Sequence, residues 1–299
     1  MDIKNPTYVP GHGLLKDRSV LITAAAGAGI GFAAAKRAVE EGCRAIVISD
    51  IHEGPQESSV EKLKAETGLD KVWGKTCNVA NEEQVQALVN FAEDKLGGVD
   101  VLINNAGLGT TKLLIEMEDD EWNKVIDVTL NGTMRMTRYM MKIMKGRGTG
   151  VIVNNASVLG WRAQKEQAHY AAAKAGVMAL TRCVALEAAD FGVRINAVSP
   201  SLAVHPMLKK SAPEELLAEL EGRLRGSQEY FVTVRGNWFH GDSFLKDVPG
   251  VLEIKLKRDA GEERDYVIVT EQSNEVRSWI ATQVVRSGHE LHTLKPVEW

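Results

Sequence analysis

Short apolar segments alternate with longer amphipathic segments through the first two thirds of the chain. The apolar segments predict six strands, at residues 19–23, 45–49, 75–79, 99–103, 150–154 and 194–198. The amphipathic segments between them predict helices at residues 31–41, 57–66, 82–96, 119–144 and 164–190. Strands that alternate with helices are typical of a parallel sheet covered by helices. We therefore predict an α/β fold of the Rossmann type, with a doubly wound parallel sheet.

The pattern changes at about Gly226, where shorter segments alternate between apolar and polar residues as strands do. These segments predict three strands and one helix, at residues 230–235, 251–257, 266–270 and 274–287. In the arrangement that we favour, residues 1–225 form the parallel-sheet domain and residues 226–299 form a small α+β module whose strands pair with one another. In the alternative, residues 226–273 are an insertion, and residues 275–293 add a helix and a seventh strand to the parallel sheet.

Composition excludes several classes of partner. The 299 residues are 44% hydrophobic, enough for one large core and a small second unit, and the net charge is −4. No basic field attracts nucleic acid or an anionic membrane, so we expect neither as a partner. The three cysteines lie far apart and form no metal or disulfide motif, so no metal site is expected. No signal peptide or long apolar run is apparent, and we expect a cytoplasmic protein.

A glycine-rich turn from Thr23 to Gly31 follows the first predicted strand and opens the first predicted helix. Small residues let the backbone turn tightly and approach a pyrophosphate, which free N–H groups and the positive end of the helix can bind. Many tight turns have a similar composition, but the position between strand and helix favours a dinucleotide site. The candidate contacts in this turn are Ala25, Gly29, Ile30 and Gly31.

Asp50 ends the second predicted strand, nineteen residues after Gly31. Its carboxylate could accept hydrogen bonds from the adenosine ribose and would repel a 2′-phosphate. No arginine stands beside the glycine turn to bind such a phosphate. We therefore expect NAD rather than NADP, although Asp50 could equally cap a turn or a helix.

Tyr170 and Lys174 stand four residues apart, thirteen residues or more after Ser157. On a helix this spacing places both side chains on one face, where the ammonium group could stabilise phenolate and lower the pKa of Tyr170. A phenol of that kind can exchange a proton near neutral pH. The same pair is also common on exposed helices, but with Ser157 and the glycine turn it favours nicotinamide-dependent hydride transfer.

These residues, with Asn104-Asn105-Ala106-Gly107 and Asn131, resemble the short-chain dehydrogenase/reductase family over about 70% of the chain. The resemblance implies that Tyr170 is the general acid and base and that Lys174 binds the nicotinamide ribose. Ser157 would bind the substrate oxygen, and Asn131 would hold a water that relays protons. Further cofactor contacts implied by the resemblance are Asn78, Val79, Asn105, Ala106, Gly107 and Pro200. A homodimer or homotetramer is also implied.

The chain departs from the family pattern at several positions. Ala24-Ala25 stands where Thr-Gly is usual, Asn78 where aspartate is common, and Pro200-Ser201 where Pro-Gly is usual. The usual segment that closes the sheet is absent in recognisable form. The tail faintly resembles small sulfur-carrier domains, but no cysteine follows Cys183 to carry sulfur.

Finer motifs, such as Asn154-Asn-Ala-Ser-Val-Leu-Gly-Trp, look like an actinobacterial subgroup that oxidises hydroxyacyl-CoA fragments in steroid ring degradation. That likeness implies that Trp161 and Gln164 flank the substrate. We predict an NAD-dependent oxidoreductase that interconverts a secondary alcohol and a ketone on an acyl thioester. The alternatives are an NADPH-dependent 3-oxoacyl carrier-protein reductase and a catalytically idle nucleotide-binding or interaction protein.

Overall fold

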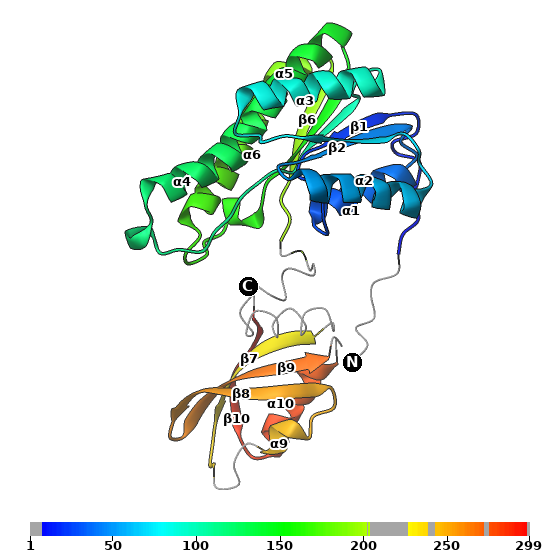
Figure 1. Cartoon of the computed structure of the whole chain (residues 1–299). Helices are drawn as coiled ribbons and strands as arrows, with labels where there is room; N and C mark the ends of the chain where they lie inside the picture. Colours follow the sequence, from blue (N-terminus) through cyan, green and yellow to red (C-terminus); the bar gives the residue numbers. More distant parts are fainter. Residues whose placement is uncertain (1–7, 202, 204–226, 239–242, 272–274, 298–299) are drawn as a thin grey trace. The chain divides into compact units, whose positions relative to one another are not determined.

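The computed structural model describes residues 8–201, 203, 227–238, 243–271 and 275–297. These residues fall into two compact units, one built on a six-stranded sheet and the other on a four-stranded sheet (Figure 1). Within the described residues, no helix is long and apolar enough to cross a lipid bilayer.

The first unit contains a parallel sheet with the strand order β3-β2-β1-β4-β5-β6. Its strands are β1 (Ser19–Ile22), β2 (Ala45–Asp50), β3 (Val72–Thr76), β4 (Val101–Asn104), β5 (Gly150–Asn155) and β6 (Val193–Val198). The order reverses beside β1, and a ligand crevice forms at the carboxyl ends of the strands on either side of such a reversal. The predicted doubly wound parallel sheet is confirmed.

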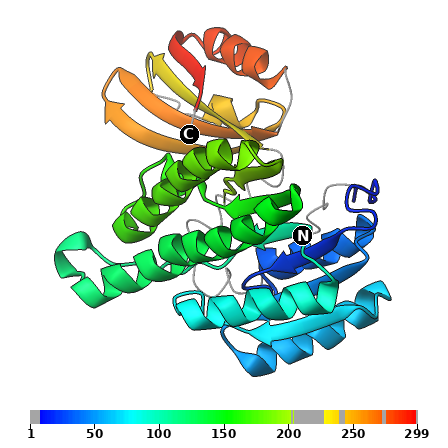
Figure 2. The same cartoon turned by 90° about the horizontal axis from the view of Figure 1, so that it is seen from above.

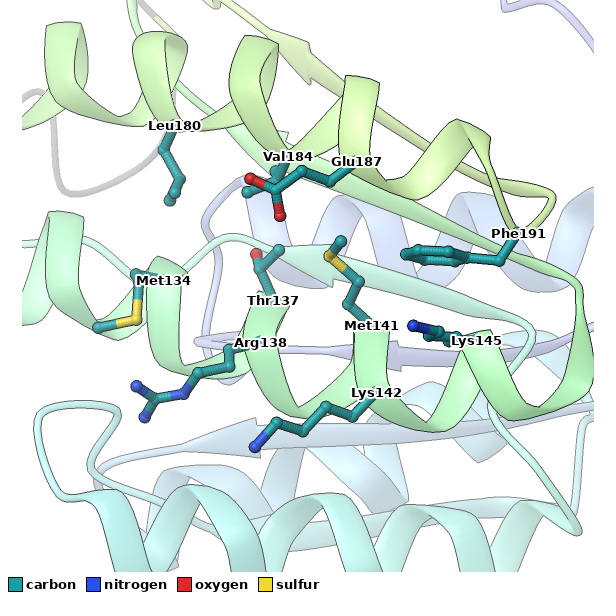
Figure 3. A pocket seen from close by; sticks show the side chains of 10 residues that line it. All are labelled: Met134, Thr137, Arg138, Met141, Lys142, Lys145, Leu180, Val184, Glu187 and Phe191. Atoms are coloured by element: carbon teal, nitrogen blue, oxygen red, sulfur yellow. The ribbon is translucent and has the colours of Figure 1, made fainter.

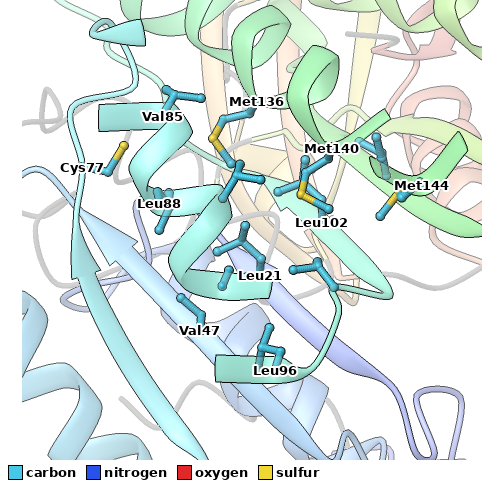
Figure 4. Packing of buried hydrophobic residues seen from close by; sticks show 14 of the residues in the cluster. Leu21, Val47, Cys77, Val85, Leu88, Leu96, Leu102, Met136, Met140 and Met144 are labelled. Carbon is cyan, nitrogen blue, oxygen red and sulfur yellow. The ribbon is translucent and has the colours of Figure 1, made fainter. Parts of the chain in front are cut away.

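Helices cover this sheet on both faces (Figures 1 and 2). They are α1 (Ile30–Glu40), α2 (Glu53–Thr67), α3 (Glu82–Leu96), α4 (Asp119–Ile126), α5 (Gly132–Arg147) and α6 (Ala168–Ala189), with the π-helical turn η2 (Asp127–Asn131) and two 3-10 turns, η1 (Leu114–Glu116) and η3 (Val158–Gly160). On one face, strand residues such as Leu21 and Leu102 pack against Leu88 of α3 and Met136 and Met140 of α5 (Figure 4). The other face packs against α1 and α2. This second layer is thin at β6, where Arg194, Asn196 and Val198 are exposed.

The bounds of several predicted elements in this unit are wrong. The second helix, predicted at residues 57–66, begins at Glu53. The third strand pairs with β2 through Val72 and Trp73 and ends at Thr76, because Asn78 turns the chain with its side-chain oxygen accepting a hydrogen bond from Ala80 N. The single helix predicted at 119–144 is divided by η2 into α4 and α5. The helix predicted from Gln164 begins only at Ala168.

The second unit contains an antiparallel sheet with the strand order β10-β7-β9-β8. Its elements are β7 (Ser227–Arg235), α9 (Ser243–Lys246), β8 (Val251–Ala260), β9 (Glu263–Glu271), α10 (Val276–Arg286) and β10 (Glu290–Pro296). This β-α-β-β-α-β succession and strand order are those of ferredoxin-like folds. Alternate residues of β7, including Val232 and Val234, pack with Leu245 of α9 and Ile280 of α10 in a core of their own.

Strand β10 pairs with β7, so the segment at 275–293 does not add a seventh strand to the parallel sheet. This pairing contradicts the arrangement with an inserted segment. The favoured arrangement had three strands and lacked β10. In β10 the alternation of apolar and polar residues is interrupted, because a β-bulge lies between Leu291 and Thr293 in the pairing with β7. The predicted boundary between residues 225 and 226 lies outside the described residues and stays a prediction.

Candidate active site

The glycine-rich turn is joined to the loop that follows β4. Asn105 Nδ2 donates a hydrogen bond to Ala24 O at 2.8 Å, and the backbone N–H groups of Asn105 and Ala106 both donate to Thr23 Oγ1 at 3.0 Å. A Cβ atom on Gly31 would lie 2.3 Å from Ala24 O and 2.6 Å from Asn105 Nδ2. Only glycine therefore fits at position 31 without moving the backbone of the turn.

The turn accommodates its departure from the family pattern. Ala25, which stands in place of a glycine, is fully buried, and its N–H donates to Ser49 O at 2.9 Å. Ala24 adopts a φ of 49°, in the left-handed region where side chains other than glycine are strained. The alanines are thus held in a turn by β2 and by Asn105.

Asp50 lies beside the glycine turn at the end of β2. One carboxylate oxygen accepts a hydrogen bond from Ala26 N at 3.3 Å, and the other accepts one from Ile51 N at 2.9 Å. Gly27 N donates to Ser59 Oγ of α2 at 2.9 Å. The carboxylate therefore both caps the turn and places a negative charge at its edge.

Lys174 is buried beneath the loop that follows β4. Its side chain is 3% exposed, its Nζ donates to Asn155 O at 2.5 Å, and its Nζ lies 5.6 Å from the centre of the Tyr170 ring. Burial lowers the pKa of Lys174 to about 8. Two glycines of this loop pack closely against the pair. A Cβ on Gly107 would lie 3.3 Å from Lys174 Nζ, and one on Gly109 would lie 3.1 Å from Tyr170 Cδ2.

The pKa of Tyr170 is shifted in the direction opposite to the sequence expectation. Burial raises it, and the hydrogen bond with Ser157, which lowers it, does not offset the burial. Lys174, whose Nζ lies 5.6 Å from the centre of the ring, does not offset the burial. The expected lowering of the Tyr170 pKa by Lys174 is therefore wrong for this arrangement of side chains, and Ser157 is the neighbour that favours phenolate.

A cavity of about 350 Å³ lies at these carboxyl ends. Of the residues predicted from the sequence, it is lined by Gly29, Ile30, Asn105, Gly107, Tyr170 and Lys174. It is also lined by four residues that the sequence reasoning missed, Gly109, Asn155, Ser201 and Ala203. Asn155 ends β5, so the rule that ligands bind at the carboxyl ends of strands could have found it.

Several predicted residues lie outside this lining. Asn78 closes its own turn, Val79 is buried against Gly132 of α5, and Pro200 O accepts a hydrogen bond from Val158 N at 3.0 Å. Trp161 is 70% exposed, with its Nε1 donating to Ser199 Oγ at 3.3 Å, and Gln164 is exposed.

Asn131 is the last residue of η2. Its Nδ2 donates to Asp127 Oδ1 at 3.0 Å, one turn earlier in the same π-helical segment. Such π-helical turns often occur at functional sites, because they change the direction of the side chains that follow. Asn131 is not among the residues that line the cavity described above.

A second concavity, of about 410 Å³, lies between α5 and α6 (Figure 3). Apolar side chains from both helices line it, among them Met134, Met141, Leu180 and Val184, with Arg138 and Glu187 at its rim. None of the predicted catalytic residues lines it. Within the described residues, no group of three His, Cys, Asp or Glu side chains could hold a metal ion.

The residues around the first cavity fit a nicotinamide dinucleotide. Gly29 opens the cavity without a neighbour within 4 Å of a Cβ, so a pyrophosphate could approach the backbone closely. The Lys174 ammonium has three donors, of which Asn155 O uses one, and its side chain lines the cavity. Ribose hydroxyls could accept the others.

Comparison with known proteins agrees with this geometry. Residues 18–216 match the family model described as short chain dehydrogenase. The chain belongs to the short-chain dehydrogenase family. Members of this family bind nicotinamide cofactors and are oxidoreductases, so this chain is an oxidoreductase.

Three similar proteins extend this result. A Mycobacterium tuberculosis protein named (5R,7aS)-5-hydroxy-7a-methyl-1-oxo-2,3,5,6,7,7a-hexahydro-1H-indene-carboxyl-CoA reductase is 53% identical over 216 residues, 72% of this chain and 82% of that protein. A 3-oxoacyl-(acyl-carrier-protein) reductase of Vibrio harveyi is 34% identical, over 72% of this chain and 87% of that protein. The crystal structure of a short chain dehydrogenase from Mycobacterium smegmatis is 53% identical, with a TM-score of 0.65 over 68% of this chain and 84% of that structure. All three matches leave over a quarter of this chain uncovered.

Proposed function

We propose that this chain is an NAD-dependent oxidoreductase that transfers a hydride between nicotinamide and the secondary alcohol or ketone of a hydroxyacyl-CoA from steroid ring catabolism. One observation carries the proposal: Tyr170 and Lys174 line the same cavity as Gly29 of the glycine turn. A proton donor, a cation and a dinucleotide turn are therefore assembled around one space.

When bound, the nicotinamide ring supplies the hydride chemistry at its C4 atom. Ser157 donates a hydrogen bond to the substrate oxygen and holds it beside the Tyr170 phenol. In the reductive direction, Tyr170 gives its proton to the oxygen of the ketone as the C–H bond forms, and in the oxidative direction it takes the proton of the alcohol. Lys174 would hold the ribose through the donors that Asn155 O leaves available. Asn131 holds a water on the path that returns the proton to solvent.

The preference for NAD rests on Asp50. Its carboxylate lies within hydrogen-bond distance of Ala26 N in the glycine turn. A 2′-phosphate would bring a second negative charge to the same edge, which costs electrostatic energy. Ribose hydroxyls would instead donate to the carboxylate.

The substrate class rests on likeness to a relative. The Mycobacterium tuberculosis protein that is 53% identical is named as the reductase of a fused-ring carboxyl-CoA. The same substrate class is indicated by the motif around Ser157, in which Trp161 directly follows η3. Trp161 and Gln164 are exposed on the segment between η3 and α6, where they could contact a large ligand.

A second candidate is a 3-oxoacyl-(acyl-carrier-protein) reductase, because a protein of that name is 34% identical over 72% of this chain. Such an enzyme would be expected to prefer NADPH, which Asp50 disfavours. We also propose a homodimer or homotetramer, which the exposed apolar groove between α5 and α6 supports. Sedimentation of the purified protein measures its mass in solution directly.

Turnover of a substrate panel tests the proposal. Hydroxyacyl-CoA and 3-oxoacyl thioesters are supplied with NADH and with NADPH, and nucleotide binding is followed by fluorescence. We expect turnover of fused-ring acyl-CoA esters with NADH. Preference for 3-oxoacyl carrier-protein substrates with NADPH would establish the second candidate. Nucleotide binding with no turnover of any substrate would indicate an idle binding protein.

A further inference from the structure

His169, which directly precedes Tyr170 on α6, is fully buried. Its Nε2 lies 2.7 Å from Thr110 Oγ1, in the loop that follows β4. Its Nδ1 is buried with no hydrogen-bond partner. A buried N–H without an acceptor is rarer than a buried lone pair without a donor. We therefore assign the proton to Nε2, which then donates a hydrogen bond to Thr110 Oγ1.

The Thr110 contact belongs to a set of bonds that hold the far end of this loop against the start of α6. Gln167 Nε2 donates to Thr110 O at 3.0 Å and to Thr111 Oγ1 at 3.2 Å. Lys112 N donates to Glu166 O at 3.0 Å. Among these contacts, the one from His169 is made by a side chain with no exposed surface, although Thr110 itself is exposed.

The near end of the loop is held as firmly. Leu108 N donates to Thr129 Oγ1 at 3.0 Å, and the Thr129 hydroxyl donates back to Leu108 O at 3.2 Å. Gly109 lies between these two attachments and Gly107 directly precedes Leu108; Gly107 lies against Lys174, Gly109 lies against Tyr170, and both line the cavity. The loop therefore forms a wall of the site, and the position of that wall depends on both attachments.

We propose that His169 is a positioning residue, which holds residues 107–110 over Tyr170 and Lys174 through its bond to Thr110 and so fixes the phenol at the substrate. The inference rests on the function proposed above for Tyr170. The imidazole touches neither substrate nor cofactor. It acts by keeping the wall closed over a phenol whose burial depends on that wall.

Two variants separate the hydrogen bond from the volume of the side chain. His169→Leu fills much of the space and has no donor. His169→Gln carries an N–H donor at about the reach of Nε2. Thr110→Val removes the partner from the loop with little change of shape. If the hydrogen bond positions the loop, His169→Leu and Thr110→Val remove the same interaction, and their effects are not additive in a double-mutant cycle.

The first readout needs no substrate. Tyrosine labelled with carbon-13 is titrated by NMR, and the Tyr170 signal among the five tyrosines is assigned with Tyr170→Phe. Since burial raises the pKa of Tyr170, we expect it to fall toward its ordinary value in His169→Leu and Thr110→Val and to stay near the wild-type value in His169→Gln. An unchanged Tyr170 pKa in folded His169→Leu protein would overturn the proposal.

The second readout is turnover. We expect kcat to fall about ten- to a hundredfold in His169→Leu and Thr110→Val, since misplacing a reacting group by about 1 Å can cost that much, and the dissociation constant of NADH to change less than about twofold. Recovery of kcat in His169→Gln supports positioning. If His169→Leu and His169→Gln lose kcat, NADH affinity and melting temperature to the same extent as each other, His169 only stabilises the fold. That result would overturn the proposal. If wild-type protein turns over nothing while the Tyr170 pKa moves as expected, the positioning role holds and the proposed reaction fails.

Discussion

The two units arrange their polar side chains in different ways. In the parallel-sheet unit, buried amides join neighbouring strands at one end of the sheet: Asn104 Nδ2 donates to Asn154 Oδ1 at 2.9 Å, and Asn154 Nδ2 donates to Thr181 Oγ1 at 2.9 Å. In the C-terminal unit, charged side chains pair across neighbouring strands at the surface, as Arg258 does with Asp265 at 2.6 Å.

The difference follows from strand direction. All strands of a parallel sheet end at the same edge, so the residues that follow them converge on one crevice. In an antiparallel sheet the carboxyl ends alternate between two edges, and polar residues are distributed along the faces. The chemistry of this chain is therefore expected in the first unit, while the second carries a core of its own and no residue of the proposed mechanism.

The largest expected effect is that of Tyr170→Phe. Removal of the hydroxyl takes away the proposed acid and base, and we expect kcat to fall by about a thousandfold or more. NADH binding should change less than about twofold, because the ring remains. Turnover and fluorescence titration measure the two quantities. Turnover near the wild-type level would place the chemistry elsewhere and end the contrast between the units.

Gly31→Ala tests how tightly the glycine turn is built. The new Cβ would meet Ala24 O at 2.3 Å and Ala25 Cα at 2.9 Å, so the turn must shift. We expect the free energy of unfolding to fall by about 1–3 kcal/mol and NADH affinity to fall with it. Gly54→Ala is the matched control, since nothing lies within 4 Å of its Cβ. Equal stability of the two variants in urea would show that the turn is looser than the structure indicates.

Ile280→Ala addresses the other unit. Ile280 of α10 is fully buried in the separate core, and its truncation should cost about 2–5 kcal/mol. We expect calorimetry to show a lower melting temperature for one transition only, with NADH affinity and kcat unchanged. Val285→Ala, at a residue 65% exposed on the same helix, should have little effect. A fall in both transitions would contradict the proposed division into domains.

The sequence predicted β1 and β2 well, because their apolar runs are buried on both faces. It did not predict the break at η2, since no proline or glycine interrupts residues 119–131. Tyr170 and Lys174 were found by their four-residue spacing taken together with Ser157 and the glycine turn. The predicted direction of the Tyr170 pKa shift was wrong, because burial is a property of tertiary packing. Asn155 and Gly109 were missed because their contacts with Lys174 and Tyr170 are made by the backbone, which no side-chain motif reveals.

A smaller effect is expected from Asp50→Ala. Loss of the carboxylate should lower the preference for NADH over NADPH by about tenfold, which corresponds to about 1.4 kcal/mol. The ratio of the two dissociation constants is the measured quantity. Glu53→Ala, three residues further on in α2, controls for a general change of surface charge. An unchanged ratio for Asp50→Ala would remove the basis for expecting NAD.

The last expected effect depends on pH and concerns the burial of Lys174. Its pKa is lowered to about 8, whereas that of an unfolded lysine is near 10.4, so unfolded chains bind more protons between these values. The cost of burying the ammonium is complete below about pH 8 and is relieved as the pH rises toward 10.4. Wild-type stability should therefore rise relative to Lys174→Met across this range.

Melting temperatures of wild type and Lys174→Met, measured from pH 7 to pH 10.4, check this expectation. Groups that titrate in both proteins cancel in the difference. Lys142→Met, at an exposed lysine of α5, controls for the loss of one lysine. A difference between wild type and Lys174→Met that stays constant with pH would mean that water reaches the ammonium group. The closed wall that distinguishes this site from the surface pairs of the C-terminal unit would then be open.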